Sequence, residues 1–267
     1  MHKEPIPDEY IDALAALRQD FVAVCQSVFG DYLVAIITKG SSVKGGFIPG
    51  LSDIDMHVYL KNEAFIYSDF LKLDLGLQLQ EQMDTLIHRY EFNGSPIQVI
   101  LLNTSQPPRW SGPLPETYIV LYGEGCPEAE PTSEQMLTQD LKELTNPVYA
   151  YKLMSSYVDK PTDELCSFVR RLQPAVNPTL YRVLSLLTGD PMRVWKMTKF
   201  EALDALENLA DERAQRIAEF GREFYALATQ RERQRKDADF CREAIRAGYR
   251  VVDAGRAIGL ELETPTA

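Results

Sequence analysis

The sequence predicts an α+β protein, in which an N-terminal α/β domain with a small mixed sheet is followed by a C-terminal helix bundle. Three observations support this class. Apolar runs of strand length alternate with helical apolar stripes in the first half of the chain. Gly, Pro and Glu then cluster without periodicity between Gly123 and Thr132. Beyond that cluster, the spacing of apolar residues is helical to the end. We therefore expect two domains, at residues 1–125 and 126–267.

The predicted N-terminal domain opens with a helix that begins near Asp8 and ends at Gly30. Its apolar residues recur at intervals of three and four, as they do on one face of a helix. They are Ile11, Leu14, Leu17, Phe21, Val24 and Val28. Residues 32–37 and 53–60 are apolar runs typical of strands, and a second helix is expected within residues 69–86.

A β-hairpin is predicted around Asn93 and Gly94. This dipeptide separates residues 90–92 from the apolar run 95–102, and Asn-Gly between two such runs favours a two-residue hairpin turn. Pro96 has no N–H to donate to a ladder. It should therefore lie at the beginning of the second strand, or at a strand position whose N–H side faces away from the neighbouring strand.

The predicted C-terminal domain contains clear helix boundaries. Thr132 with Gln135, and Thr198 with Glu201, have the spacing of capping boxes, in which each side chain bonds the other's backbone. Gly189 is expected to end a helix, since glycine readily adopts the left-handed conformation found there. Long amphipathic segments follow at residues 199–209, 212–230 and 237–258.

Composition narrows the classes of function. The chain of 267 residues has a formal net charge of −11, which argues against a nucleic-acid partner. It contains no apolar run of the roughly 20 residues that span a bilayer. Its N-terminus lacks the basic-then-apolar layout of a signal peptide. The 4 cysteines have no spacing typical of zinc sites or disulfide frameworks. We expect a reduced cytoplasmic protein.

The candidate functional residues are Gly40 and Ser41, followed by Asp53 and Asp55. Two carboxylates at positions i and i+2 of a strand point to the same face, while a Gly-Ser turn allows backbone N–H groups to approach a phosphate. Mg²⁺ prefers such oxygen ligands and often binds them together with substrate phosphates. A solvated edge strand is the alternative. The combination predicts a Mg²⁺ site that binds a nucleoside triphosphate. His57 lies two residues after Asp55 and should therefore be on the same face of the strand.

Segments 40–46 (GSSVKGG) and 52–55 (SDID) resemble the signature of the nucleotidyltransferase superfamily that includes DNA polymerase β. They are most similar to the aminoglycoside adenylyltransferases that modify streptomycin and spectinomycin. Chain length and a helical C-terminal half fit that family as well. The resemblance implies a nucleotidyltransferase domain at residues 1–125 and a substrate-binding helical domain at residues 126–267.

The resemblance also implies roles for individual residues. Asp53 and Asp55 would bind Mg²⁺, and Ser41 with its backbone would contact the triphosphate of ATP. Lys199 matches a family lysine near the nucleotide phosphates, although an ammonium group in water beside the helix cap is an equal alternative. Ser52 could instead form a local hydrogen bond. The full set of nucleotide-binding candidates is Gly40, Ser41, Ser42, Ser52 and Lys199.

The sequence departs from the family at Gln98. The family has a third carboxylate at this position, which serves as general base or metal ligand. Glutamine cannot accept a proton at neutral pH, and loss of a general base typically costs about 10²–10⁴ in rate. If the predicted hairpin has a two-residue turn, Glu91 lies diagonal to Gln98 on one sheet face and could substitute for the missing base. A solvated charge on the hairpin is the alternative for Glu91.

These observations leave three functions open. The first is Mg²⁺-dependent transfer of AMP from ATP to a hydroxyl of a small molecule, with an aminoglycoside as the acceptor that the resemblance implies. The second is a nucleotide-binding sensor or regulatory protein in which Gln98 has removed most of the activity. The third is transfer of AMP to another protein, against which the long C-terminal half argues, because it offers room for an acceptor site of its own.

Overall fold

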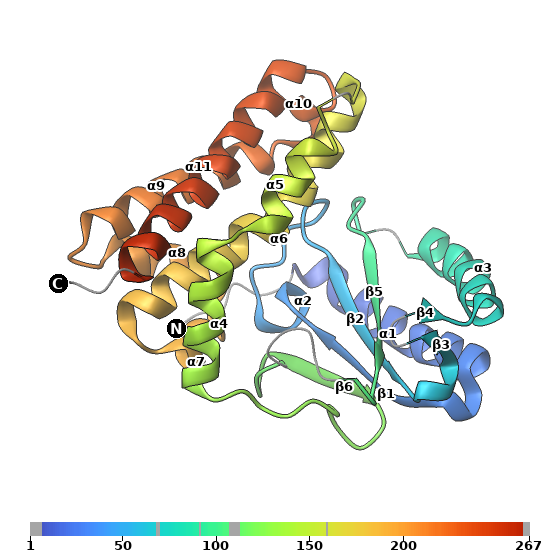
Figure 1. Cartoon of the computed structure of the whole chain (residues 1–267). Helices are drawn as coiled ribbons and strands as arrows, with labels where there is room; N and C mark the ends of the chain where they lie inside the picture. The colour runs from blue at the N-terminus through green and yellow to red at the C-terminus, as the bar shows by residue number, and fades with distance from the viewer. Residues whose placement is uncertain (1–6, 68–69, 91, 107–112, 159, 264–267) are drawn as a thin grey trace. The chain divides into compact units, whose positions relative to one another are not determined.

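The computed structural model describes residues 7–67, 70–90, 92–106, 113–158 and 160–263 (Figure 1). The chain divides into two compact units, Met1–Pro131 and Thr132–Ala267. The first contains both sheets and the second is helical, which confirms the predicted α+β class.

The first unit follows the predicted order of helix, strand, strand, helix and strand. Its elements are α1 Asp8–Phe29, η1 Gly30–Tyr32, β1 Leu33–Lys39, α2 Ser41–Lys44, β2 Ile54–Leu60, η2 Asn62–Ala64, β3 Phe65–Tyr67, β4 Phe70–Leu71, α3 Leu73–Arg89, β5 Ile97–Asn103 and β6 Tyr118–Tyr122. The main sheet has four strands in the order β5-β2-β1-β6 (Figure 1). β1 is antiparallel to both of its neighbours, whereas β2 is parallel to β5, so the sheet is mixed as expected.

The two faces of β2 have different environments. Ile54, Met56 and Val58 are fully buried in a core cluster that also contains residues of α1 and α3. Asp55 has the opposite parity, because successive side chains of a strand alternate between the faces of the sheet. A small second cluster on that opposite face contains Tyr59. Asp55 therefore lies on the face of β2 opposite the apolar residues, as predicted, whereas Asp53 lies just before the strand begins.

The predicted hairpin at Asn93 and Gly94 is wrong. The two residues do form a turn with positive φ angles of 53° and 82°, but this turn connects α3 to β5. β5 pairs in parallel with β2, from Ile54 beside Ile97 to Leu60 beside Asn103. A parallel pair needs a long crossover connection, and the chain from η2 through α3 supplies it.

Aromatic packing explains why no strand forms before this turn. The ring of Phe92 is 1% exposed and lies 5.9 Å from that of Tyr10 in α1, so it is held in the core rather than in a ladder. The remaining expectation about this segment is confirmed. Pro96 lies immediately before β5, and its carbonyl oxygen accepts a hydrogen bond of 2.9 Å from the N–H of Ile54.

The second unit is a bundle of helices, all within the described part of residues 132–267. They are α4 Ser133–Thr145, α5 Val148–Ser155, α6 Thr162–Thr188, α7 Pro191–Val194, α8 Lys199–Glu207, α9 Glu212–Ala228, α10 Arg231–Gln234 and α11 Ala238–Glu263. Both predicted capping boxes are present, at Thr132 and Thr198, and Gly189 ends α6 in the left-handed conformation. α6 continues through Pro174 and Pro178, which the sequence does not predict, because proline usually ends a helix.

The core of this bundle depends on close approach between α8 and α9 and between α6 and α11. A Cβ atom at Gly221 of α9 would lie 2.6 Å from Leu203 Cδ2, and one at Gly255 of α11 would overlap Thr179 Cγ2. Glycine at these positions lets the helices pack without a gap. None of the helices in the described residues is both long and apolar enough to cross a membrane.

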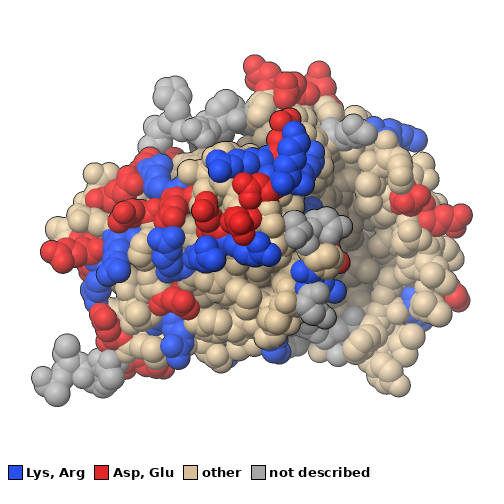
Figure 2. Space-filling model, turned by 90° about the horizontal axis from the view of Figure 1, so that it is seen from above, with Lys and Arg blue, Asp and Glu red and all other residues tan. Residues whose placement is uncertain are grey.

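Charged side chains of both signs are interspersed on the face of the molecule shown in Figure 2. In the helical unit many of them form exposed ion pairs, including Arg213 with Glu261 at 2.6 Å and Arg250 with Glu223 at 2.8 Å. Exposed pairs of this kind contribute roughly 0–1 kcal/mol each. Each such pair is electrically neutral, so it leaves the net charge of −11 unchanged.

Candidate active site

The turn after β1 brings backbone against a carboxylate. Gly40 has a φ angle of 77° and a ψ angle of −154°, a combination that is accessible essentially to glycine. A Cβ atom at this position would overlap Asp55 Oδ2. The carbonyl oxygen of Gly40 accepts hydrogen bonds from the N–H groups of Val43 (3.1 Å) and Lys44 (3.0 Å), which closes the short helix α2.

Several hydrogen bonds fix this turn and the loop that follows it. Ser42 is 1% exposed, its hydroxyl donates to the carbonyl oxygen of Lys39 at 3.2 Å, and its own carbonyl accepts from Arg18 Nη2 at 2.9 Å. Ser52 is 5% exposed, and its hydroxyl accepts from the N–H of Ile48 at 3.0 Å. The Ser42 and Ser52 hydroxyls thus have structural partners, whereas half-buried Ser41 opens α2, where helical N–H groups have no partner in their own helix.

Asp53 and Asp55 lie at the beginning of β2 and are both half-buried. Burial raises the pKa of Asp55 to about 6, the positive charge of Lys39 opposes this rise, and the negative charge of Asp53 adds to it. The two carboxylates are therefore close enough to repel each other. Such a pair is stabilised by a cation.

The donor set at this position fits a Mg²⁺ ion. Within the described residues, no group of three or more His, Cys, Asp and Glu side chains is arranged to hold a metal ion. The protein thus offers the two carboxylates of Asp53 and Asp55. Mg²⁺ characteristically takes one or two carboxylates together with water and substrate phosphates, so two half-exposed carboxylates beside a backbone turn suit it.

Lys39 is a residue of this site that the sequence analysis did not identify. It is the last residue of β1 and the cross-strand partner of Asp55. Burial lowers the pKa of Lys39, while the negative charges of Asp55 and Glu128 act to raise it. Lys39 could have been found from the sequence by pairing residues 33–39 with residues 54–60 as antiparallel strands, because that pairing places Lys39 opposite Asp55.

Glu128 and Tyr59 form a second polar group on the same face of the sheet. The hydroxyl of Tyr59 donates to Glu128 Oε1 at 2.8 Å and lies 3.4 Å from Cys126 Sγ. His57 is fully buried between Asp55 and Tyr59 on the strand, and burial together with Lys39 lowers its pKa to about 3. His57 is therefore a neutral interior residue.

Gln98 lies directly beside Asp55, because the two residues are partners in the parallel ladder of β2 and β5. Its side chain is exposed. Glu91 lies outside the described residues. The hairpin register that would have brought Glu91 diagonal to Gln98 does not exist, since Tyr90 follows the end of α3 and is not in a strand.

Lys199 belongs to the helical unit. Its side chain is 4% exposed, and its Nζ lies 5.5 Å from the ring centre of Tyr225 and 5.8 Å from that of Phe200. The alternative in which its ammonium group is solvated is therefore wrong. A contact between Lys199 and nucleotide phosphates stays a prediction.

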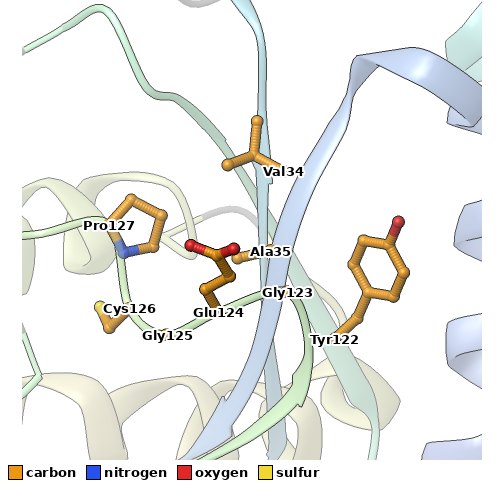
Figure 3. A pocket seen from close by; sticks show the side chains of 8 residues that line it. All are labelled: Val34, Ala35, Tyr122, Gly123, Glu124, Gly125, Cys126 and Pro127. Atoms are coloured by element: carbon orange, nitrogen blue, oxygen red, sulfur yellow. The ribbon is translucent and has the colours of Figure 1, made fainter.

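A pocket of about 660 Å³ lies at the other end of β1 from this site (Figure 3). It is lined by Val34, Ala35, Tyr122, Gly123, Glu124, Gly125, Cys126 and Pro127. Gly123 makes the close approach there, since a Cβ atom at that residue would lie 2.5 Å from the carbonyl oxygen of Val34. None of the predicted site residues lines this pocket, but Cys126 does, and its Sγ lies 3.4 Å from the hydroxyl of Tyr59.

No protein-family profile matches this sequence, and none of the curated protein sequences matches it. Among solved structures, the fold is similar to that of the spectinomycin adenyltransferase AAD(9) from Enterococcus faecialis, whose crystal structure contains ATP and spectinomycin. The match covers 87% of this chain and 99% of that chain, with 12% sequence identity and a TM-score of 0.49. At 12% identity the similarity concerns the fold alone, and the activity and ligands of this chain do not follow from it.

Proposed function

We propose that this protein is a nucleotidyltransferase that transfers AMP from ATP to a hydroxyl group of a small molecule. The observation that carries the proposal is the contact between two parts of one motif. The backbone of Gly40 lies against the carboxylate of Asp55, with Asp53 beside it at the start of β2. This geometry supports binding of a triphosphate and a divalent cation at adjacent positions.

In the proposed reaction, the acceptor hydroxyl oxygen forms a bond to the α-phosphorus while the bond from that phosphorus to the bridging oxygen of pyrophosphate breaks. Asp53 and Asp55 would hold Mg²⁺, which supplies positive charge to the phosphate oxygens. The N–H groups of Ser41 and Ser42, which open the turn, would contact the phosphates, because those of Val43 and Lys44 already bond the carbonyl oxygen of Gly40. The shape of the turn is maintained by the hydrogen bonds of Ser42 and Arg18.

The proton of the acceptor hydroxyl would pass to water, because Gln98 cannot accept it. Its position beside Asp55 favours a second candidate function, in which the protein binds Mg²⁺ and ATP as a sensor with little transfer. Both candidates share the same nucleotide site and differ in turnover. The motif resemblance makes an aminoglycoside the first acceptor to test.

Calorimetric titration of ATP with Mg²⁺ tests the shared site. We expect binding to the wild type, and loss of binding in the double variant Asp53→Asn/Asp55→Asn. The matched control Asp31→Asn/Glu63→Gln removes the same charge from two exposed residues of the same unit and should bind normally. Absence of metal-dependent binding in the wild type would refute the proposal.

Pyrophosphate release in the presence of a panel of aminoglycosides then separates the two candidates. Release that depends on one acceptor, with AMP recovered on the small molecule, supports the transferase. Binding without release supports the sensor. Radiolabel from ATP recovered on a protein would instead identify transfer to a macromolecule.

A further inference from the structure

Lys39 occupies a position next to the carboxylates where its charge affects a bound cation. It ends β1 directly opposite Asp55, and side chains of directly opposed residues in antiparallel strands lie on one face, with Cβ atoms about 4.5–5.5 Å apart. Asp55 thus has Asp53 two residues before it, just ahead of β2, and Lys39 opposite it on the neighbouring strand. The side chain of Lys39 is half-buried, so it is fixed within the face rather than extended into water.

A third carboxylate approaches Lys39 from another segment. Glu128 follows β6, and its Oε1 accepts a hydrogen bond from Tyr59, which holds the side chain on this face of the sheet. Glu128 Oε2 is buried and has no hydrogen-bond partner within the described part of the chain. Both Asp55 and Glu128 lie within electrostatic range of the Lys39 ammonium group.

The charges of these groups can be counted. Asp53, Asp55 and Glu128 contribute three negative charges and Lys39 one positive charge, so the group carries a net charge of −2 when all are ionised. One divalent cation balances the charge of these four side chains before the charge of the nucleotide is counted. In two-metal sites the ions lie about 3.5–4 Å apart, and here the neighbour of Asp55 in β5 is the neutral Gln98, which adds no further negative charge beside Asp55.

We propose that Lys39 takes the electrostatic place of a second metal ion, so that this site binds its nucleotide with a single divalent cation on Asp53 and Asp55. The inference rests on the proposed function and concerns the number of ions that the site holds. Lys39 acts as a positioning residue: it neutralises one side of Asp55 and repels a second cation from that side.

Counting bound Mn²⁺ by electron paramagnetic resonance tests this inference without turnover. The protein is titrated with Mn²⁺ in the presence of a saturating, non-hydrolysable ATP analogue. We expect one Mn²⁺ per chain in the wild type. In Lys39→Met, loss of the repulsion should raise Mn²⁺ affinity about tenfold or more. Lys39→Met/Gln98→Glu, with one more carboxylate and no ammonium group, should bind a second ion.

Two control variants separate charge from packing. Lys39→Arg keeps the positive charge and should bind one ion, as the wild type does. Lys61→Met removes an exposed lysine just after the end of β2 and should not change Mn²⁺ affinity. The thermal unfolding midpoint of each variant shows whether it is folded.

Two results would overturn the inference and leave the proposed function standing. One is binding of two ions by the wild type, and the other is unchanged affinity in folded Lys39→Met with one ion bound. A wild type that binds neither Mn²⁺ nor the nucleotide analogue would overturn the proposed function itself, and the inference with it.

Discussion

Replacement of Gly40 by alanine tests whether the contact between turn and carboxylate controls nucleotide binding. Two costs are expected. A non-glycine residue in this backbone region is strained by about 1–3 kcal/mol. The new Cβ atom would also overlap Asp55 Oδ2, so the carboxylate must move away from its position. Overpacking costs about 1–3 kcal/mol more, so the free energy of unfolding of the N-terminal unit should fall by about 2–6 kcal/mol in total.

Gly94→Ala is the matched control, because it shares one cost and lacks the other. Gly94 has a φ angle of 82°, close to that of Gly40, but a Cβ atom there would have no neighbour within 4 Å. Gly94→Ala should thus lose about 1–2 kcal/mol from strain and keep its affinity for ATP with Mg²⁺. Gly40→Ala should lose more stability and at least about tenfold in affinity, since about 1.4 kcal/mol corresponds to that factor.

Urea unfolding measures the first quantity and calorimetric titration of ATP with Mg²⁺ measures the second. The reasoning would be refuted if Gly40→Ala bound the nucleotide as tightly as Gly94→Ala and lost no more stability. In that case the approach of the turn to Asp55 would have no role in binding.

Three further predictions concern the base, the pH dependence and the helical unit. Gln98→Glu should raise the rate of pyrophosphate release with a competent acceptor by about 10²–10⁴ if the missing base limits turnover, and an unchanged kcat would show that it does not. Because the pKa of Asp55 is raised in the folded state, this residue should make the free energy of unfolding fall as pH rises from about 4 to 6, and Asp55→Asn should flatten that part of a pH series of urea unfolding curves. Mg²⁺ affinity should rise over the same range, because the ionised carboxylate binds the cation, and a pH-independent affinity would contradict this. Gly255→Ala should lower the unfolding midpoint of the helical unit by overpacking against Thr179, at a cost of about 1–3 kcal/mol, without changing nucleotide affinity.

Local signals in the sequence predicted most of the elements correctly. The capping boxes at Thr132 and Thr198 and the stop at Gly189 could be read because the residues that form them are close together in the chain. The parity of Asp55 was likewise readable, since it needs only the alternation of a strand, although β2 begins after Asp53. These features do not depend on what packs against them.

Features that depend on long-range pairing were not predictable in the same way. Asn93 and Gly94 signal a turn, but whether the chain enters that turn from a strand or a helix depends on the packing of Phe92 against α1. The position of Lys39 beside Asp55 required knowledge of which strands are neighbours. Continuation of α6 through Pro178 is a tertiary effect of the same kind, because helix packing overrides a residue that would otherwise end the helix.

The parallel register between β2 and β5 has an evolutionary consequence. Because Gln98 is the partner of Asp55 on β5, the residue type at this one position determines whether that partner is neutral or negatively charged. Glutamine and glutamate codons differ by a single base, and the two side chains are nearly the same size. Because Gln98 is exposed, that substitution would disturb little of the fold. A lineage of this protein could therefore gain or lose a third carboxylate in one mutational step, while the rest of the sheet stays the same.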